Sequence, residues 1–401
     1  MIPNHEEMHG MYGTYPIGRD ATGTSWVPGS TLMPMIHRMY DDWVMMIMGN
    51  LMAIYDDQTG SRGARKFFSE NMLMYTSQKD FGIGTFALRS MISFEPGTIG
   101  CKGYPLLLQT GETCNGVTSL IDRQHPHDFL MELAAVYTLR FTDENSLFAY
   151  FGYPGEPALG PTAYINRFSA FFNPEAPITH HWLDSTHISF GVGTLGYVHD
   201  WLKIDASIFN GREPDQHRWD FDKPRFNSYS VRLSVNPIES IAAQISCGFL
   251  KSPEQLEPNV NTIRTTASLS YNLAWEESNW QITAAWGANR ESPGHFLNGV
   301  LLESAIEIKR RHVLFGRGEY VAKDDLFIPP NPNAGKVFNV GKLDLGYIFE
   351  FPVIPYTLWG IGAVGSVSFV PSSIRSSYGG TPVSFMVFLR IELIDKRNSH
   401  Y

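Results

Sequence analysis

The stretch Val383-Ser-Phe-Met-Val-Phe-Leu-Arg-Ile-Glu-Leu393 determines how the rest of the chain is interpreted. Every second residue from Val383 to Leu393 is apolar, whereas the intervening positions include Ser384, Arg390 and Glu392. Because side chains alternate between the two faces of a β-strand, this period of two predicts a strand with unlike faces. The apolar face must contact a core or lipid, and the other face must contact water or polar partners.

The same alternation recurs back to about residue 41 and predicts about sixteen strands. The predicted strands span residues 41–55, 66–78, 82–95, 127–141, 145–153, 185–199, 201–211, 226–236, 238–250, 262–273, 278–290, 297–309, 311–323, 336–350, 355–370 and 382–394. The connections between them alternate between short turns and longer loops, of which 96–126, 154–184 and 212–225 are the longest.

This alternation of short and long connections indicates the fold class. If the strands are antiparallel, every short turn lies on one side of the sheet, together with both termini, and every long loop lies on the other. Outer-membrane barrels have this arrangement, with short periplasmic turns and long outer loops. We therefore expect an all-β chain that forms a transmembrane antiparallel β-barrel. Aromatic residues near strand ends, such as Trp201, Trp280 and Phe351, fit the interfacial girdles of such barrels.

Three segments follow from this interpretation. Residues 1–38 have no clear period and are rich in Gly, Pro, His and Met, which predicts an irregular N-terminal segment or plug. Residues 39–394 form the barrel, and residues 395–401 form a short polar tail. The first residues have neither a basic head nor an apolar run, so we expect no secretory signal within this chain.

Composition excludes several classes of protein. Only 18% of the 401 residues are charged, against roughly a quarter in average soluble proteins. Aromatic residues reach 13%, with 36 Gly and 25 Pro, which suits many strands joined by turns. The net charge of −9 argues against a nucleic-acid partner. The chain contains no long uncharged apolar run, so we expect no membrane-spanning helix.

The polar faces of the predicted strands collect charges of both signs. We expect the following residues to line the lumen: Glu132, Arg140, Lys203, Asp205, Arg232, Arg264, Glu303, Glu307, Arg317, Glu319, Lys342, Asp344, Arg390 and Glu392. An even mixture of acids and bases favours cross-strand ion pairs in a wet lumen over a strongly ion-selective pore. In a soluble sheet with one solvated face, the same residues would be ordinary surface charges.

Several longer motifs resemble a known family. They are Tyr104-Pro-Leu-Leu-Leu-Gln-Thr-Gly-Glu112, Asp122-Arg-Gln-His-Pro-His-Asp128, Pro154-Gly-Glu-Pro-Ala-Leu-Gly-Pro161, Asn173-Pro-Glu-Ala-Pro-Ile178, His180-His-Trp-Leu-Asp-Ser-Thr-His187 and Asn210-Gly-Arg-Glu-Pro-Asp-Gln-His-Arg-Trp-Asp220. Over residues 20–393 the chain resembles a largely uncharacterised family of Gram-negative outer-membrane β-barrel proteins. The resemblance implies an outer-membrane location and an association with copper or heavy-metal handling. The chain departs from many barrels because a polar tail follows its last strand.

Methionine placement offers a first candidate metal site. Thirteen of the fifteen methionines precede residue 92, interleaved near the N-terminus with histidines. Thioether and imidazole ligands suit copper in its two oxidation states. The two N-terminal clusters have plausible ligand spacing and comprise His5, Met8, His9 and Met11, and Met33, Met35 and His37. The methionines at 45–52 and 72–74 fit ordinary apolar strand positions.

Histidines and carboxylates in the long outer segments form a second candidate. The residues are His125, His127, Asp128, His180, His181, Asp184, His187 and His217. Imidazole with carboxylate could bind a divalent metal. Alternatively, these residues are part of a hydrogen-bonded loop core, for which the neighbouring Asp, Glu and Arg residues supply partners. Such a core could fold the 154–184 loop into the barrel.

A third possibility is hydrolysis. His187 and Ser189 lie two residues apart on a predicted strand and share a face, a spacing that a Ser–His pair could use. The arrangement resembles that of outer-membrane phospholipase, but here the pair is expected to face the lumen rather than lipid.

Three cysteines complete the candidates. Cys101 and Cys114 share one Gly-rich segment and either close a loop disulfide in an oxidising compartment or remain two thiols. Cys247 lies on an apolar strand face, where we expect it to serve as a small apolar side chain.

We therefore expect a porin-like outer-membrane channel for small solutes, linked to copper or other metal handling, without enzymatic activity. The alternatives are a hydrolase that uses His187 and Ser189, and a non-conducting adhesion or scaffold barrel. Lipid, small solutes or metal ions are the expected partners, and oligomers are compatible with the strand pattern.

Overall fold

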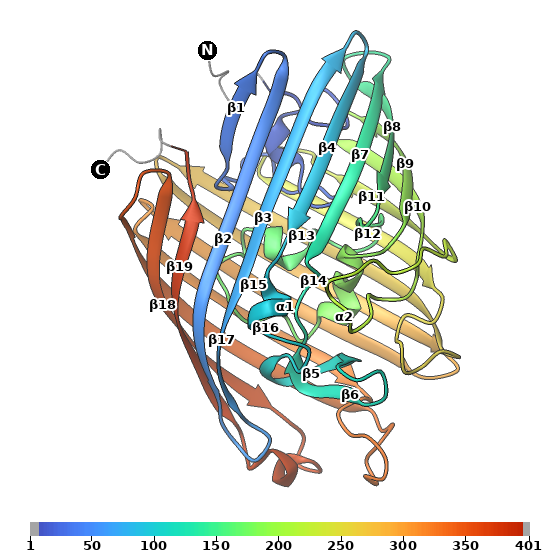
Figure 1. Ribbon diagram of the computed structural model, residues 1–401, viewed down its shortest axis with the longest axis vertical. Helices are drawn as coiled ribbons and strands as arrows, with labels where there is room; N and C mark the ends of the chain where they lie inside the picture. Colours follow the sequence, from blue (N-terminus) through green and yellow to red (C-terminus); the bar gives the residue numbers. More distant parts are fainter. Residues whose placement is uncertain (1–7, 396–401) are drawn as a thin grey trace.

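Nearly all regular structure in the computed structural model, which describes residues 8–395, is β-strand. Sixteen strands form one closed antiparallel barrel, in which successive strands pair and β19 closes onto β2 (Figure 1). The barrel strands are β2 (Trp43–Gln58), β3 (Arg65–Phe81), β4 (Gly84–Ile92), β7 (Leu130–Arg140), β8 (Asn145–Gly152), β9 (Val192–His199), β10 (Leu202–Phe209), β11 (Ser228–Val235), β12 (Ile241–Leu250), β13 (Asn261–Trp275), β14 (Ser278–Ser292), β15 (Phe296–Ile308), β16 (His312–Lys323), β17 (Phe338–Pro352), β18 (Thr357–Phe369) and β19 (Val383–Leu393). The expected fold class is confirmed, and each barrel strand overlaps a predicted one.

Within residues 8–395, no helix is both long and apolar enough to cross a membrane.

The seam of the barrel is formed by the two ends of the chain. β19 pairs with residues 50–58 of β2, whereas β1 (Ile36–Tyr40) pairs with residues 43–47 of the same strand. Because β3 occupies the other edge of β2, β1 and β19 follow one another along one edge. The sequence predicted an irregular segment up to residue 38, but its last residues belong to strand β1. A two-residue turn at Asp41 and Asp42 folds this strand back onto β2.

The alternation seen in the sequence separates exterior from interior. On β11, Tyr229 and Val231 are 63% and 46% exposed, whereas Arg232 is 1% exposed. On β19, Phe385 and Val387 are exposed and Arg390 is buried. An apolar exterior around a charged interior is the reverse of a soluble protein and fits a barrel surrounded by lipid.

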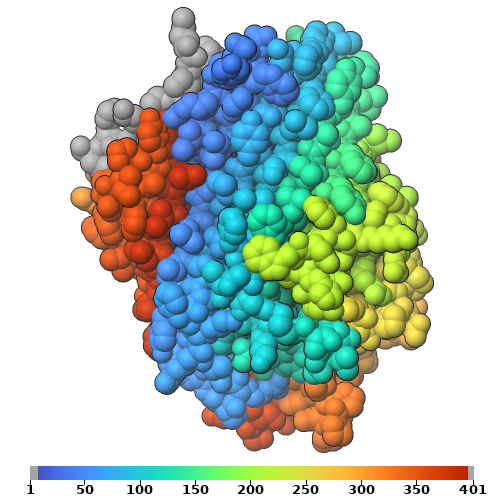
Figure 2. Space-filling view, in the orientation of Figure 1, coloured from blue at the N-terminus to red at the C-terminus, as the bar shows by residue number. Residues whose placement is uncertain are grey.

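The barrel wall is uneven. Strands β8 to β11 have 8 residues each, whereas β13, β14 and β17 have 15. Long connections lie beside the short strands. Figure 2 shows the lime-coloured loop at 210–227 lying across the front of the molecule, where Trp219 stacks on Phe129.

The first long loop contains structure that the sequence did not reveal. It holds α1 (Glu95–Thr98) and a hairpin of β5 (Tyr104–Thr113) and β6 (Ser119–Gln124), which stands apart from the barrel sheet. A disulfide joins Cys101 to Cys114. The alternation is absent because both faces of β5 are buried, so both faces are largely apolar or hydrogen-bonded.

Two segments fold into the lumen. Residues 8–35 with η2 (Ile17–Arg19), here called the plug, lie inside the end of the barrel that carries the short turns (Figure 1). Residues 153–191, here called the inner loop, contain η3 (Tyr164–Asn166), α2 (His180–Leu183) and η4 (Ser185–His187) and are almost entirely buried. One further short helix, η5 (Arg375–Tyr378), lies in the β18–β19 loop.

The lipid-facing assignment of β19 predicts a depth-dependent cost of charge. Val387 lies near the middle of the strand and Val383 at its loop end, and both face outward. We expect Val387→Arg to destabilise the folded barrel by about 2–4 kcal/mol and Val383→Arg by about 0–1 kcal/mol, measured by urea unfolding in lipid bilayers. Equal costs at the two positions would contradict a membrane-embedded exterior.

Candidate functional site

The plug is tied to the inner wall by hydrogen bonds from strand side chains. Thr24 is at the centre of this contact, since its Oγ1 donates to Asp205 Oδ2 at 2.6 Å and accepts from Arg232 Nη2 at 2.7 Å. Lys203 Nζ donates to the carbonyl oxygen of Thr24. Other plug carbonyls accept hydrogen bonds from Arg89, Thr138, Ser146, Asn236 and Asn272. The wall thus satisfies backbone groups that an irregular segment cannot pair internally.

The inner loop is tied to the opposite strands by ion pairs. Arg167 Nε lies 2.5 Å from Glu303 Oε1, and Arg317 Nε lies 3.1 Å from the other oxygen of Glu303. Glu175 Oε2 lies 2.7 Å from Lys342 Nζ. All five side chains are buried, so each charge depends on its partner for stabilisation.

Aromatic residues of the inner loop contact a further charged side chain of the wall. The Arg390 guanidinium lies 4.9 Å from the ring centroid of Phe171 and 4.7 Å from that of Phe172. It also pairs with Glu350 and Glu392 on the wall. Cation–π contacts of this kind are strongest where water is excluded.

The residues expected to line the lumen lie on the inner side of the strands, but their surroundings differ from the expectation. All fourteen except Arg140 and Glu307 are buried. Many contact the inner loop directly: Arg264 donates to Ser185, Glu319 accepts from Thr179, and Asp344 accepts from Asn173. The inner loop and the plug occupy much of the lumen, so these wall charges contact protein groups of both segments as well as one another.

A cavity between the plug and the wall gathers methionines. Its lining includes Met11, Met33 and Met35 of the plug, His37 of β1, and Met46 and Met74 of the wall. We call it the methionine cavity. It brings Met11 of the first N-terminal cluster together with the second cluster, more than twenty residues further along the sequence. Met8 belongs to the same buried apolar cluster as Met46. Thioethers are soft ligands that suit Cu⁺.

Two other N-terminal candidates lie elsewhere. His9 turns away from the cavity: its Nε2 lies 2.8 Å from Asp80 Oδ2 and 2.8 Å from Arg140 Nη1. His5 lies outside the described residues.

Three of the predicted histidines come together around Tyr164. The Nδ1 atoms of His127, His180 and His187 lie 2.8 Å from Glu95 Oε2, Asp184 Oδ1 and the Asp184 carbonyl oxygen, respectively. The His187 ring centroid lies 5.3 Å from that of His127 and 5.1 Å from that of His180. We call these three residues the histidine group.

Burial favours the neutral form of two histidines of the inner loop, His187 and His181. Burial, followed by the nearby His180 and His127, lowers the pKa of His187 to about 3, and burial lowers the pKa of His181 to about 4. Burial opposes ionisation of Asp184, but His180 and Arg167 hold the pKa of this carboxyl below its ordinary range.

The remaining predicted ligands are dispersed. His125 stacks on His181 with ring centroids 6.2 Å apart, and His181 Nε2 lies 3.6 Å from Glu213 Oε2. Gly111 has a φ of +106°, and a Cβ there would lie 2.0 Å from the His181 ring, so only glycine permits this approach. Asp128 pairs with Arg218 at 3.0 Å, and His217 is exposed.

The predicted strand at 185–199 is wrong in its first part. Residues 185–187 form a 3₁₀ turn, and β9 begins only at Val192, because the inner loop re-enters the wall there. Ser189 Oγ donates to Thr186 O, and His187 Nδ1 faces Asp184 O. Among the described contacts of these two residues there is no hydrogen bond between them, so the structure does not form the Ser–His pair that the hydrolase alternative requires.

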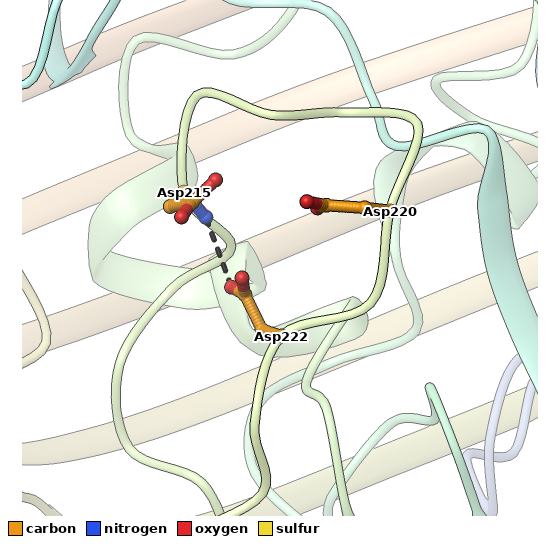
Figure 3. A group of neighbouring side chains, drawn as sticks. All are labelled: Asp215, Asp220 and Asp222. Atoms are coloured by element: carbon orange, nitrogen blue, oxygen red, sulfur yellow. Dashed lines mark hydrogen bonds between the residues drawn. The ribbon is translucent and has the colours of Figure 1, made fainter.

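An acidic group lies on the loop outside the barrel. The carboxylates of Asp215, Asp220 and Asp222 point toward one another, with ligand atoms within 4.8 Å (Figure 3). Asp222 Oδ2 accepts a hydrogen bond from the backbone of Asp215. Oxygen ligands of this kind suit a hard cation such as Ca²⁺.

Sequence reasoning missed several residues of these sites. Met46 and Met74 had a usable signal, since they share a strand face with the polar residues Asn50 and Thr76 and therefore point inward. Tyr164 and Glu175 had none, because they lie in segments without a period and contact residues distant in the sequence. Glu95 was predicted to end a strand but instead begins α1, where it contacts His127.

Together, the closed strand order, the apolar exterior and the charged interior define the class of protein. The chain has the fold of outer-membrane β-barrel proteins, and its exterior is consistent with a location in the cell outer membrane.

Comparisons with solved structures agree with this class. The chain is similar to OmpF of Salmonella typhi, solved in complex with daunomycin, at a TM-score of 0.54 and 9% identity over 89% of this chain and 100% of that one. It is similar to OmpT of Vibrio cholerae with loop L8 deleted, at a TM-score of 0.52 and 8% identity over 88% of this chain and 100% of that one. It is also similar to an anion-selective porin from Comamonas acidovorans, at a TM-score of 0.50 and 9% identity over 88% of this chain and 100% of that one. No protein-family model and no curated protein matches the chain.

The contact between the plug and the inner loop predicts a pH dependence. Glu156 lies beneath the plug at Thr22 and Gly23, and burial raises its pKa to about 8 despite the nearby Arg232. Because its folded pKa lies above its unfolded value, protonated Glu156 stabilises the closed structure fully below about pH 4.5, and this contribution is lost as the pH rises through about 8. We expect thermal stability in detergent to fall over this range.

Glu156→Gln is the matched test of this dependence, since the amide keeps the shape of the protonated acid. We expect the variant to lose much of the fall in melting temperature between about pH 5 and about pH 9. A variant with the same pH profile as the parent would show that Glu156 is not responsible.

Proposed function

We propose that this protein is a gated outer-membrane channel for small polar solutes, closed in this structure by the plug and the inner loop and linked to the handling of soft metal ions such as Cu⁺. The observation that carries the proposal is the polarity of the wall behind the plug. Arg89, Lys203, Asp205 and Arg232 face the lumen and contact the plug chiefly through hydrogen bonds.

A polar wall favours a channel over a permanently filled barrel. If the plug left, these side chains would be hydrated and could retain wall partners, such as Asp205 for Arg232 at 2.9 Å. An apolar wall would instead resist water entry. These wall side chains are the kind of polar group that lines a water-filled lumen.

The filled lumen also favours a second candidate, a non-conducting scaffold barrel. The two candidates differ in one measurable property, which is ion conductance. We expect no hydrolysis by His187 and Ser189, because no hydrogen bond joins the two side chains among their described contacts and Ser189 Oγ donates to the Thr186 carbonyl oxygen instead.

Conductance of the full chain in planar bilayers tests the channel. Thr24→Val keeps the side-chain shape but removes the hydroxyl that joins Asp205 and Arg232. Loss of both contacts should destabilise the docked plug by about 1–3 kcal/mol and raise the open probability about fivefold or more.

Thr265→Val on the lipid-facing side of β13 is the control and should conduct as the parent does. A parent and a Thr24→Val variant that are both folded and both silent would support the scaffold instead.

The methionine cavity generates the metal test. Met33→Leu combined with Met35→Leu keeps the volume of both side chains but removes two thioethers from the cavity. We expect the affinity of the detergent-solubilised protein for Cu⁺ to fall at least about tenfold.

Met45→Leu is the control, because it lies next to Met46 on the alternate face of β2 and is absent from the cavity lining. Equal Cu⁺ affinity in all three proteins would remove metal handling from the proposal and leave the channel untouched.

A further inference from the structure

We infer that the histidine group, His127, His180 and His187, is a binding site for one divalent transition-metal ion, with the Nε2 atoms as ligands. The site is separate from the methionine cavity in position and in chemistry. Imidazole nitrogen suits Zn²⁺, Co²⁺ and Cu²⁺, whereas the thioethers of the cavity suit Cu⁺. The inference does not depend on the channel proposal.

The first argument is the orientation of the rings. A histidine that binds a metal through one ring nitrogen almost always donates a hydrogen bond from the other to a carboxylate or a carbonyl. All three rings have this arrangement on Nδ1, with acceptors 2.8 Å away on Glu95 and Asp184. Nε2 is therefore the ring nitrogen that faces an ion, although that of His127 already lies 3.5 Å from the Tyr164 hydroxyl.

The second argument is an unsatisfied atom. His187 is 8% exposed, and its Nε2 has no hydrogen-bond partner among the described residues. A buried polar atom without a partner costs about 1–3 kcal/mol, which an ordinary hydrogen-bonded loop core would avoid. A metal ion supplies the missing partner.

The third argument is ring spacing. With a metal–nitrogen distance of about 2.0–2.1 Å and tetrahedral angles, the centroids of two imidazoles on one ion lie about 5.2 Å apart. The observed separations from His187 are 5.3 Å to His127 and 5.1 Å to His180. His127 and His180 each match this spacing to His187 but have no ring contact with each other among the described contacts, so an ion bound at His187 would have to draw both rings inward.

Two groups surround the site and complete it. Asp184 orients His180 and His187, accepts the backbone N–H of Tyr164 at 2.9 Å, and pairs with Arg167. The Tyr164 hydroxyl lies 3.5 Å from His127 Nε2, within reach as a fourth ligand. A cavity lined by Glu70, Glu95, His127 and Tyr164 adjoins the group and offers an acidic approach for a cation.

Co²⁺ is the probe for this site, because a tetrahedral Co²⁺ site absorbs visible light strongly. The full chain is refolded into micelles with Co²⁺, desalted and titrated. We expect one tightly bound ion per chain, abolished in His187→Gln and weakened about 10–100-fold in Glu95→Gln, which disturbs only the orientation of His127.

Two controls give the result its meaning. His312→Gln, at an exposed position on β16, and the Met33→Leu/Met35→Leu variant should both bind Co²⁺ as the parent does. If His187→Gln does not fold by the heat-dependent gel mobility typical of barrels, His127→Gln replaces it. A parent without saturable Co²⁺ binding, or equal binding in the His187→Gln and His312→Gln variants, overturns the inference.

Discussion

The structure depends on how charges inside the barrel are neutralised. A strand that faces lipid on one side must place its polar residues on the other, so the barrel interior of this chain carries many Arg, Lys, Asp and Glu side chains. Buried charges without partners are strongly destabilising. The plug and the inner loop supply those partners, as Thr24 does for Asp205 and Arg232, and as Arg167 and Glu175 do for Glu303 and Lys342.

In the proposed channel, this arrangement would let one lumen be filled in the closed state and hydrated in the open state. Partners such as Thr24 offer groups that water can replace, whereas an apolar core offers none. The plug end holds thioethers and the inner loop holds imidazoles, so the two segments that close the barrel also carry the candidate metal sites. Any movement that opens the lumen would therefore disturb these sites as well.

The strands could be predicted from the sequence because the alternation within each strand, such as Val383 to Leu393, shows directly which side chains face lipid. The prediction failed for segments that are buried on all sides, because they show no alternation. The predicted strand at residues 185–191 is an inner-loop segment, buried all round, and β5 lost its alternation for the same reason. The sequence grouped His127 and His187 among eight candidate ligands, but it could not show which of the eight meet, because the contact joins two loops sixty residues apart.

Hydrogen exchange of the full chain in micelles tests the central claim most directly, because it reports whether the inner loop is docked. The amides of Tyr164 and Thr179 donate to the buried carboxylates of Asp184 and Glu319. The account predicts that these amides exchange as slowly as those of the barrel strands. Exchange as fast as in the exposed turn at 331–336 would contradict it, because the lumen charges would then be neutralised by water.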